Sequence, residues 1–158
     1  MCLIIDANCF RLVFSKDAKK HKNFAPVWKW ISEGRGRMIY GGTKYNRELR
    51  DWGMLGVVSE LAKQRKTVQI PTATVDPIAL ALKAKFPEAA FDDEHIVALV
   101  IASRCRVVCT NDNPAISYLR RPDVFSDHQG VERPKIFRGR KDHIKLCCDK
   151  HVVPICRE

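Results

Sequence analysis

Cys2-Leu3-Ile4-Ile5-Asp6-Ala7-Asn8 opens the chain, and Arg106-Val107-Val108-Cys109-Thr110-Asn111-Asp112-Asn113-Pro114 has the same organisation further along. In each stretch a short continuous apolar run ends at acidic or amide residues, which is typical of a strand buried on both faces of a parallel sheet. Asp6 and Asp112 are therefore predicted to follow the carboxyl ends of two strands. Pro114 suits the first turn of a helix after the second strand.

Helical and extended patterns alternate through the rest of the chain. Helices are expected at residues 24–33, at 43–63 with an interruption near Gly53, at 77–86 with Asp76 as the cap and Pro77 in first position, and at 92–104. Extended segments are expected at residues 37–40, 67–70 and 135–137. The alternation predicts a three-layer α/β/α fold around a mainly parallel central sheet. We assign residues 1–120 to the core and the more irregular residues 121–158 to a basic C-terminal extension packed on the same domain.

Length, charge and cysteine usage narrow the class of protein. The 158 residues fit one domain, and 28 Lys and Arg against 18 Asp and Glu give a net charge of +10. This balance favours an anionic partner, nucleic acid first, with a solubilising surface or an acidic protein as alternatives. The seven cysteines are an odd number with no signal peptide before them, which predicts reduced thiols in a cytoplasm. No apolar stretch approaches the ~18 residues of a membrane span.

Four carboxylates are predicted to meet in one crevice. Ligands of open parallel sheets bind beyond the carboxyl ends of the strands, where Asp6 and Asp112 lie. Asp93 would enter from the start of the 92–104 helix, and Glu48 from the helix after the 37–40 strand. Clustered carboxylates repel one another unless a cation joins them. Hard oxygen ligands select Mg²⁺ or Mn²⁺, which can promote phosphodiester hydrolysis.

These residues resemble the PIN-domain ribonucleases. The resemblance rests on three blocks in matching order, over roughly residues 1 to 120: Leu3-Ile4-Ile5-Asp6-Ala7-Asn8, Asp93-x-x-Ile96-Val97-Ala98-Leu99, and Val107-Val108-Cys109-Thr110-Asn111-Asp112. It implies a metal-dependent RNA endonuclease with Asp6, Glu48, Asp93 and Asp112 as the acidic set. It further implies that Thr110 or Asn111 orients a carboxylate or a water molecule.

By analogy with small stand-alone members of the family, the resemblance suggests the toxin of a bacterial toxin–antitoxin pair, with an acidic antitoxin-like protein as partner. Self-association into a homodimer is left open. Two other functions also stay open: a non-catalytic RNA-binding or scaffold module, and a metal-dependent nuclease for DNA flaps or single strands.

Alternatives exist for single residues as well. Asp6, Asp93 and Asp112 could each be only a cap or a turn former. Glu48 could be a solvated helix residue that pairs with a Lys or Arg. Asp92 or Glu94 could replace or supplement Asp93 as a ligand.

Basic residues near Glu48 are predicted to contact the RNA backbone. Arg47 and Arg50 flank Glu48, and Lys44 lies in the same stretch. A late cluster holds soft zinc ligands, and on a helix three of them would share one face. We leave it out of the metal set because it lacks a Cys-x-x-Cys pair and because adjacent cysteines cannot easily ligate one ion. Its members are His143, Cys147, Cys148, His151 and Cys156.

Overall fold

A five-stranded parallel sheet forms the centre of the molecule. The computed structural model describes residues 2–157. The strands are β1 (Cys2–Ile5), β2 (Arg37–Gly41), β3 (Thr67–Ile70), β4 (Val107–Cys109) and β5 (Lys135–Phe137). They lie in the order β3-β2-β1-β4-β5, and every neighbouring pair is parallel. The sheet includes all the extended segments expected from the sequence.

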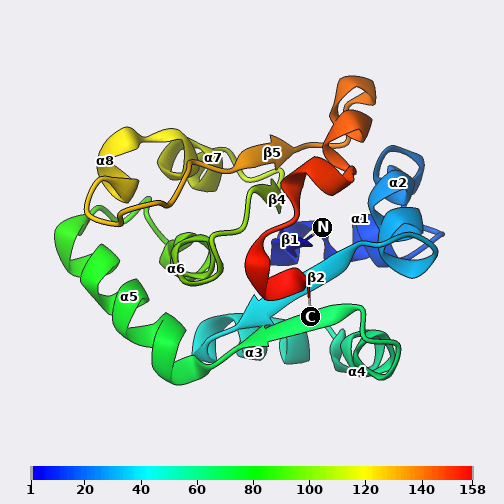
Figure 1. Cartoon of the computed structure of the whole chain (residues 1–158), viewed down its shortest axis with the longest axis horizontal. Coiled ribbons are helices and arrows are strands. Elements are labelled where there is room, and N and C mark those ends of the chain that lie inside the picture. The colour runs from blue at the N-terminus through cyan, green and yellow to red at the C-terminus, as the bar shows by residue number, and fades with distance from the viewer. Residues whose placement is uncertain (1, 158) are drawn as a thin grey trace.

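Helices cover both faces of this sheet. The α-helices are α1 (Phe10–Phe14), α2 (His21–Ser32), α3 (Thr43–Asp51), α4 (Leu55–Lys63), α5 (Thr72–Lys85), α6 (Glu94–Ser103), α7 (Asn113–Arg120) and α8 (Pro122–Phe125). Short 3-10 helices are η1 (Ala7–Cys9), η2 (Lys141–Leu146), η3 (Asp149–His151) and η4 (Pro154–Cys156). Figure 1 shows α5 to α8 on one side of the sheet and α1, α2 and α4 on the other. The predicted three-layer α/β/α fold is confirmed.

The strand order places a topological switch between β1 and β4. From β1 the chain moves outward to β2 and β3, and it then crosses back to β4 on the other side of β1. Connections that leave two neighbouring strands in opposite directions open a crevice beyond their carboxyl ends, and this is where open α/β sheets bind ligands. Asp6 directly follows β1 and Thr110 directly follows β4. Both residues thus lie at this switch point.

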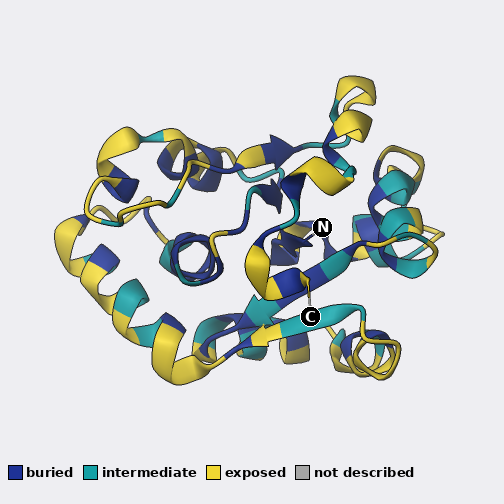
Figure 2. Ribbon diagram, in the orientation of Figure 1, coloured by how far each residue is buried: buried dark blue, intermediate teal, exposed yellow. Residues whose placement is uncertain are grey.

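Helix α6 is buried on all sides (Figure 2). Its residues from His95 to Ile101 are all buried, and the helix contacts β1, β2, β3 and α5. An all-round apolar helix of this kind belongs inside the core. The start of α6, which carries Asp93 and His95, is consequently held by packing.

The expected start of α5 was wrong. The helix begins at Thr72, so Pro77 lies inside it and Asp76 is not its cap. Instead, the Asp76 carboxylate accepts hydrogen bonds from the backbone nitrogen and the hydroxyl of Thr43, at 2.9 Å and 2.6 Å. Asp76 therefore satisfies a backbone donor in the first turn of α3, a tertiary contact that local sequence does not encode. The expected start of α2 was also late, since the helix begins at His21.

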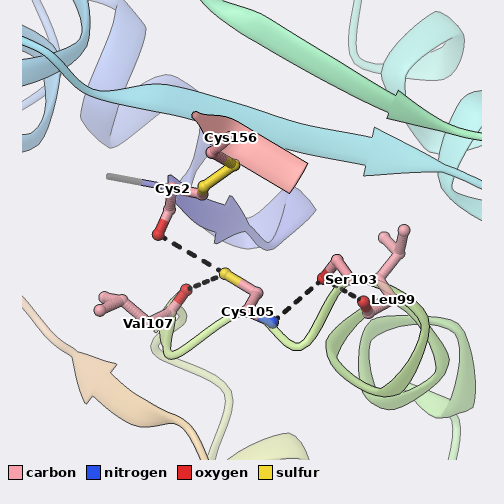
Figure 3. Close-up of a disulfide and its surroundings, with 6 residues drawn as sticks. All are labelled: Cys2, Leu99, Ser103, Cys105, Val107 and Cys156. Atoms are coloured by element: carbon pink, nitrogen blue, oxygen red, sulfur yellow. Dashed lines mark hydrogen bonds between the residues drawn. A yellow bond between two sulfur atoms is a disulfide. The ribbon is translucent and has the colours of Figure 1, made fainter. Parts of the chain in front are cut away.

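The expectation that all cysteines are reduced was wrong. Cys2, in β1, forms a disulfide with Cys156, near the end of the chain (Figure 3). Cys9, Cys105 and Cys109 are free and buried among apolar side chains, as small hydrophobes are. The disulfide ties the C-terminal segment to the central strand of the sheet.

The late His and Cys residues do not share a helical face. A zinc site on one helical face would need a continuous helix, but this segment forms two separate 3-10 helices, η2 and η3. Cys156 is in the disulfide, and Nδ1 of His143 accepts a 2.7 Å hydrogen bond from the backbone of Arg138. The geometry on which a zinc site would depend is absent here. In residues 2–157, no helix has the length and apolar character needed to cross a membrane.

Candidate active site

Asp6 is buried at the switch point, directly after β1. Its side chain is almost inaccessible, and its Oδ2 accepts hydrogen bonds from Thr110 Oγ1 and Asn8 Nδ2, each at 2.6 Å. Burial raises the pKa of Asp6, and the hydrogen bonds from Thr110 and Asn8 act in the opposite direction. Two fixed donors thus hold this carboxylate in one orientation.

The loops after β1 and β4 are bonded to each other. Oδ1 of Asn8 accepts a 3.2 Å hydrogen bond from the backbone nitrogen of Asn111. The hydroxyl of Thr110 accepts one of 3.0 Å from the backbone nitrogen of Asp112. Thr110 therefore links Asp6 to the Asp112 segment, while the Asn111 contact in this link comes from its backbone.

Asp93 faces two further carboxylates. It immediately precedes α6, and its side chain makes no capping hydrogen bond to the helix. Burial raises the pKa of Asp93 to about 8, together with the charge of Asp6 and a hydrogen bond and charge from Asp112. Lys44 acts in the opposite direction but does not cancel the effect. Burial and neighbouring carboxyl groups both favour the protonated form of such a carboxyl.

Glu48, on α3, contacts a buried histidine of α6. Its Oε2 lies 3.0 Å from Nε2 of His95, whose side chain is 2% exposed. The charge of Glu48 contributes to the raised pKa of Asp6, and that of His95 opposes it, so both side chains act on Asp6. Nδ1 of His95 is buried without a hydrogen-bond partner. An unpartnered buried nitrogen of this kind is costly.

Lys44 separates the neighbouring acids from this group. Its ammonium lies 2.9 Å from Oδ1 of Asp92 and 3.2 Å from Oε1 of Glu94. The hydrogen bond from Lys44 lowers the pKa of Asp92, the opposite of the effect on Asp93. Among the three consecutive acids, Asp93 is thus the one that interacts with Asp6 and Asp112. Lys44 itself, expected to contact phosphate, has its charge engaged by two carboxylates.

Arg47 and Arg50 differ in their surroundings. Arg47 is exposed and lines a cavity of about 310 Å³ that Lys83, Glu94 and His95 also border. Arg50 pairs with Asp51 at 3.2 Å, and both side chains are largely exposed. Exposed pairs of this kind are weak, but Asp51 still offsets part of the charge of Arg50. Of the two arginines, Arg47 is the one that lines this cavity, which His95 also borders.

Asp6, Glu48, Asp93 and Asp112 have the chemistry of magnesium or manganese ligands, although the structure does not group their side chains around one point. In the described range, no three His, Cys, Asp or Glu side chains are grouped closely enough to hold an ion. The donors are nevertheless hard carboxylate oxygens, and burial together with the facing carboxyls of Asp6 and Asp112 raises the pKa of Asp93. These two properties fit a divalent cation, which stays a prediction.

Asn8 and His95 were missed as site residues from the sequence. Asn8 lies two residues after Asp6, and His95 two residues after Asp93. That proximity to a predicted acid was the available signal. What the sequence could not show is that both side chains turn toward other parts of the chain, Asn8 toward Thr110 and His95 toward Glu48.

Comparison with known proteins gives no relative for this arrangement. No protein-family model, curated protein or solved structure matches the chain. The function therefore has to be argued from the residues of the crevice.

Proposed function

We propose that this protein is a metal-dependent phosphodiesterase whose active site is the crevice between β1 and β4. The observation that carries the proposal is the buried Asp6 carboxylate at the β1/β4 switch point, which Thr110 and Asn8 hold by hydrogen bonds and which Thr110 links to the Asp112 segment. The pKa of Asp93, raised by burial and by the facing carboxyl groups of Asp6 and Asp112, supports it. A fold has no structural reason to keep such groups together, and strongly perturbed carboxyls in a crevice are typical of functional sites. Three separate segments of the chain supply them.

The proposed substrate is RNA, cut internally, as the resemblance to PIN-domain ribonucleases implies. The net charge of +10 supports a polyanionic substrate. Arg47, exposed on α3 and adjacent in sequence to Glu48, supports phosphate binding on the helix that carries one of the acidic residues. A role as the toxin of a toxin–antitoxin pair, with an acidic protein as inhibitor, remains an analogy.

The roles of the residues follow from their contacts. Asp6, Asp93, Asp112 and Glu48 would hold Mg²⁺ or Mn²⁺, which when bound supplies a hydroxide nucleophile and stabilises charge on the phosphate. Thr110 and Asn8 fix the Asp6 carboxylate by donating to it. His95 holds Glu48 from the core side. Arg47 is placed to bind a phosphate oxygen beyond these acids.

A cleavage assay tests the proposal. The protein is incubated with mixed-sequence RNA and DNA in Mn²⁺, Mg²⁺ or EDTA, beside Asp6→Asn. We expect internal cuts in RNA with either metal, none with EDTA, and none with the variant. Binding of RNA without cleavage in either metal would favour the non-catalytic module. Cleavage confined to DNA would favour the flap or single-strand nuclease.

Arg47 should contribute more than Arg50 to the salt dependence of RNA binding. Each phosphate contact on a single strand contributes about 0.7 to the slope of log affinity against log salt concentration. We expect Arg47→Ala to reduce the slope by about this amount, and Arg50→Ala by less, because Arg50 is paired with Asp51. Fluorescence anisotropy in EDTA at several salt concentrations measures both. Equal slopes for the wild type and Arg47→Ala would move the phosphate contacts elsewhere.

A further inference from the structure

Basic residues gather at the amino end of the sheet, opposite the crevice. Each helix-to-strand connection delivers two of them just before or at the first residue of a strand. Because parallel strands all begin at the same end of a sheet, these pairs come together in space. The pairs are Arg35 and Arg37 at β2, Arg65 and Lys66 at β3, Arg104 and Arg106 at β4, and Arg133 and Lys135 at β5.

Two adjoining hollows are formed among these residues. The larger, about 610 Å³, has five basic lining residues (Arg35, Arg37, Arg65, Lys66 and Arg157) and one acidic residue, Asp149. The second, about 360 Å³, is lined by Arg104, Arg106, Lys150 and Arg157, with Glu132 and Asp149. Both include Val152, Asp149 and Arg157, so they adjoin at the C-terminal segment.

The Cys2–Cys156 disulfide holds that segment in place. Figure 1 shows the end of the chain, in red, running past the start of β1, and Figure 3 shows the bond between them. Cys156 itself lines the larger hollow. The C-terminal segment that lines both hollows is therefore covalently attached to β1.

Backbone conformation gives an independent sign that a basic side chain is needed here. Among residues 2–157, the non-glycine residues with positive φ are Arg65, at 58°, and Arg104, at 57°. Both lie at helix ends, where the left-handed conformation strongly favours glycine because a β-carbon is strained. The turn at Arg104 is closed by Ser103, whose hydroxyl donates to Leu99 and accepts from the Cys105 amide (Figure 3). At both turns the fold alone would favour glycine, yet the residue is arginine.

We propose that the amino end of the sheet is a second nucleic-acid site, which binds the phosphate backbone of a strand. Arginine dominates both hollows, and its planar fork matches phosphate oxygens. Neither hollow has an aromatic side chain among its described lining residues, so base stacking and aromatic anchoring of a protein partner are not provided for. Binding is therefore electrostatic and independent of sequence. This site goes beyond the proposed function, since it needs neither metal nor cleavage.

The double variant Arg65→Gly/Arg104→Gly separates binding from folding. It removes two charges and also relieves the strain at both positive φ values, so the two effects have opposite directions. We expect the affinity for a fluorescent mixed-sequence single-stranded oligonucleotide in EDTA to fall about tenfold or more, and the salt slope to fall by about 1.4. The melting temperature should rise by about 2 °C or more.

Matched variants complete the test. Lys16→Gly/Lys19→Gly removes the same charge from exposed positions between α1 and α2, and should leave affinity and salt slope near the wild-type values. Arg65→Lys/Arg104→Lys keeps the charge and should retain most of the binding without the gain in melting temperature. Unchanged oligonucleotide affinity in the glycine variant would overturn the proposal. The glycine variant is also tested with polyglutamate. If it loses polyglutamate binding while its oligonucleotide affinity is unchanged, the partner is an acidic protein and the proposal is likewise overturned.

Discussion

Replacing Asp93 by asparagine should abolish metal-dependent cleavage and, without metal, make the folded protein more stable at neutral pH. Asparagine keeps the shape of the side chain but loses the charge that would retain the ion. Mutation of residues that only support metal ligands typically lowers metal affinity or activity roughly 10- to 100-fold. Loss of a ligand itself should therefore lower cleavage at least about 100-fold. The two effects have one cause, the enforced proximity of Asp93 to Asp6 and Asp112.

The gain in stability should depend on pH in a defined direction. The Asp93 carboxyl has a pKa of about 8 in the folded chain, against 3.8 for an unperturbed aspartate. Between these values the folded state holds a proton that the unfolded state has lost, so stability falls as pH rises from about 4 to about 8. One pKa unit corresponds to about 1.4 kcal/mol. Because the site is partly solvated and its carboxyls titrate together, we expect Asp93→Asn to gain about 1 to 2 kcal/mol at pH 7.

Urea unfolding of wild type and Asp93→Asn at pH 4 to 9, in EDTA, measures this effect. The two proteins should be equally stable near pH 4 and should diverge until about pH 8. Asp92→Asn is the matched control: its carboxylate is exposed, bound to Lys44 and lowered in pKa, so its loss should slightly reduce stability at pH 7 and leave cleavage intact. Parallel pH curves for wild type and Asp93→Asn would show that Asp6 and Asp112 do not perturb the Asp93 carboxyl.

The crevice could be located from the sequence because its main residues adjoin buried strands. The apolar runs before Asp6 and Thr110 leave little choice of structure, and parallel strands end together, so residues directly after them must meet. Asp93 was reached in the same way, since it immediately precedes a helix whose sequence is apolar on all sides. In these cases a local pattern predicts where each residue lies on its strand or helix, and the parallel topology brings the residues together.

The misses depend on tertiary contacts. Aspartate is a common helix cap, but Asp76 instead accepts a hydrogen bond from Thr43, 33 residues away in sequence. Cys2 and Cys156 are separated by 154 residues, and no local pattern pairs them. His95 reads as one polar residue within an apolar helix, and only the packed structure brings it to Glu48. Each of these contacts joins segments whose secondary structure is already explained by their own local sequence, so nothing in that sequence indicates the contact.

His95 should act as a positioning residue for Glu48. Its Nε2 lies 3.0 Å from the Glu48 carboxylate, and the imidazole is buried between α3 and the acidic group. Without this donor, Glu48, whose side chain is a quarter exposed, is free to turn toward solvent. Supporting hydrogen bonds of this type are worth roughly 10- to 100-fold in metal affinity or activity. We therefore expect His95→Leu to reduce cleavage by about this factor.

The conservative variant His95→Gln distinguishes positioning from simple packing. Its amide can still donate to Glu48, whereas leucine fills the space without a donor and also removes the unpartnered Nδ1. His95→Leu should therefore be no less stable than His95→Gln by urea unfolding in EDTA. It should, however, need about tenfold or more Mn²⁺ for half-maximal cleavage, with Gln close to wild type. A structural role alone predicts that activity follows stability in both variants. If Mn²⁺ dependence is the same in wild type, Leu and Gln, His95 does not position Glu48, and Glu48 would be better interpreted as a helix residue outside the metal site.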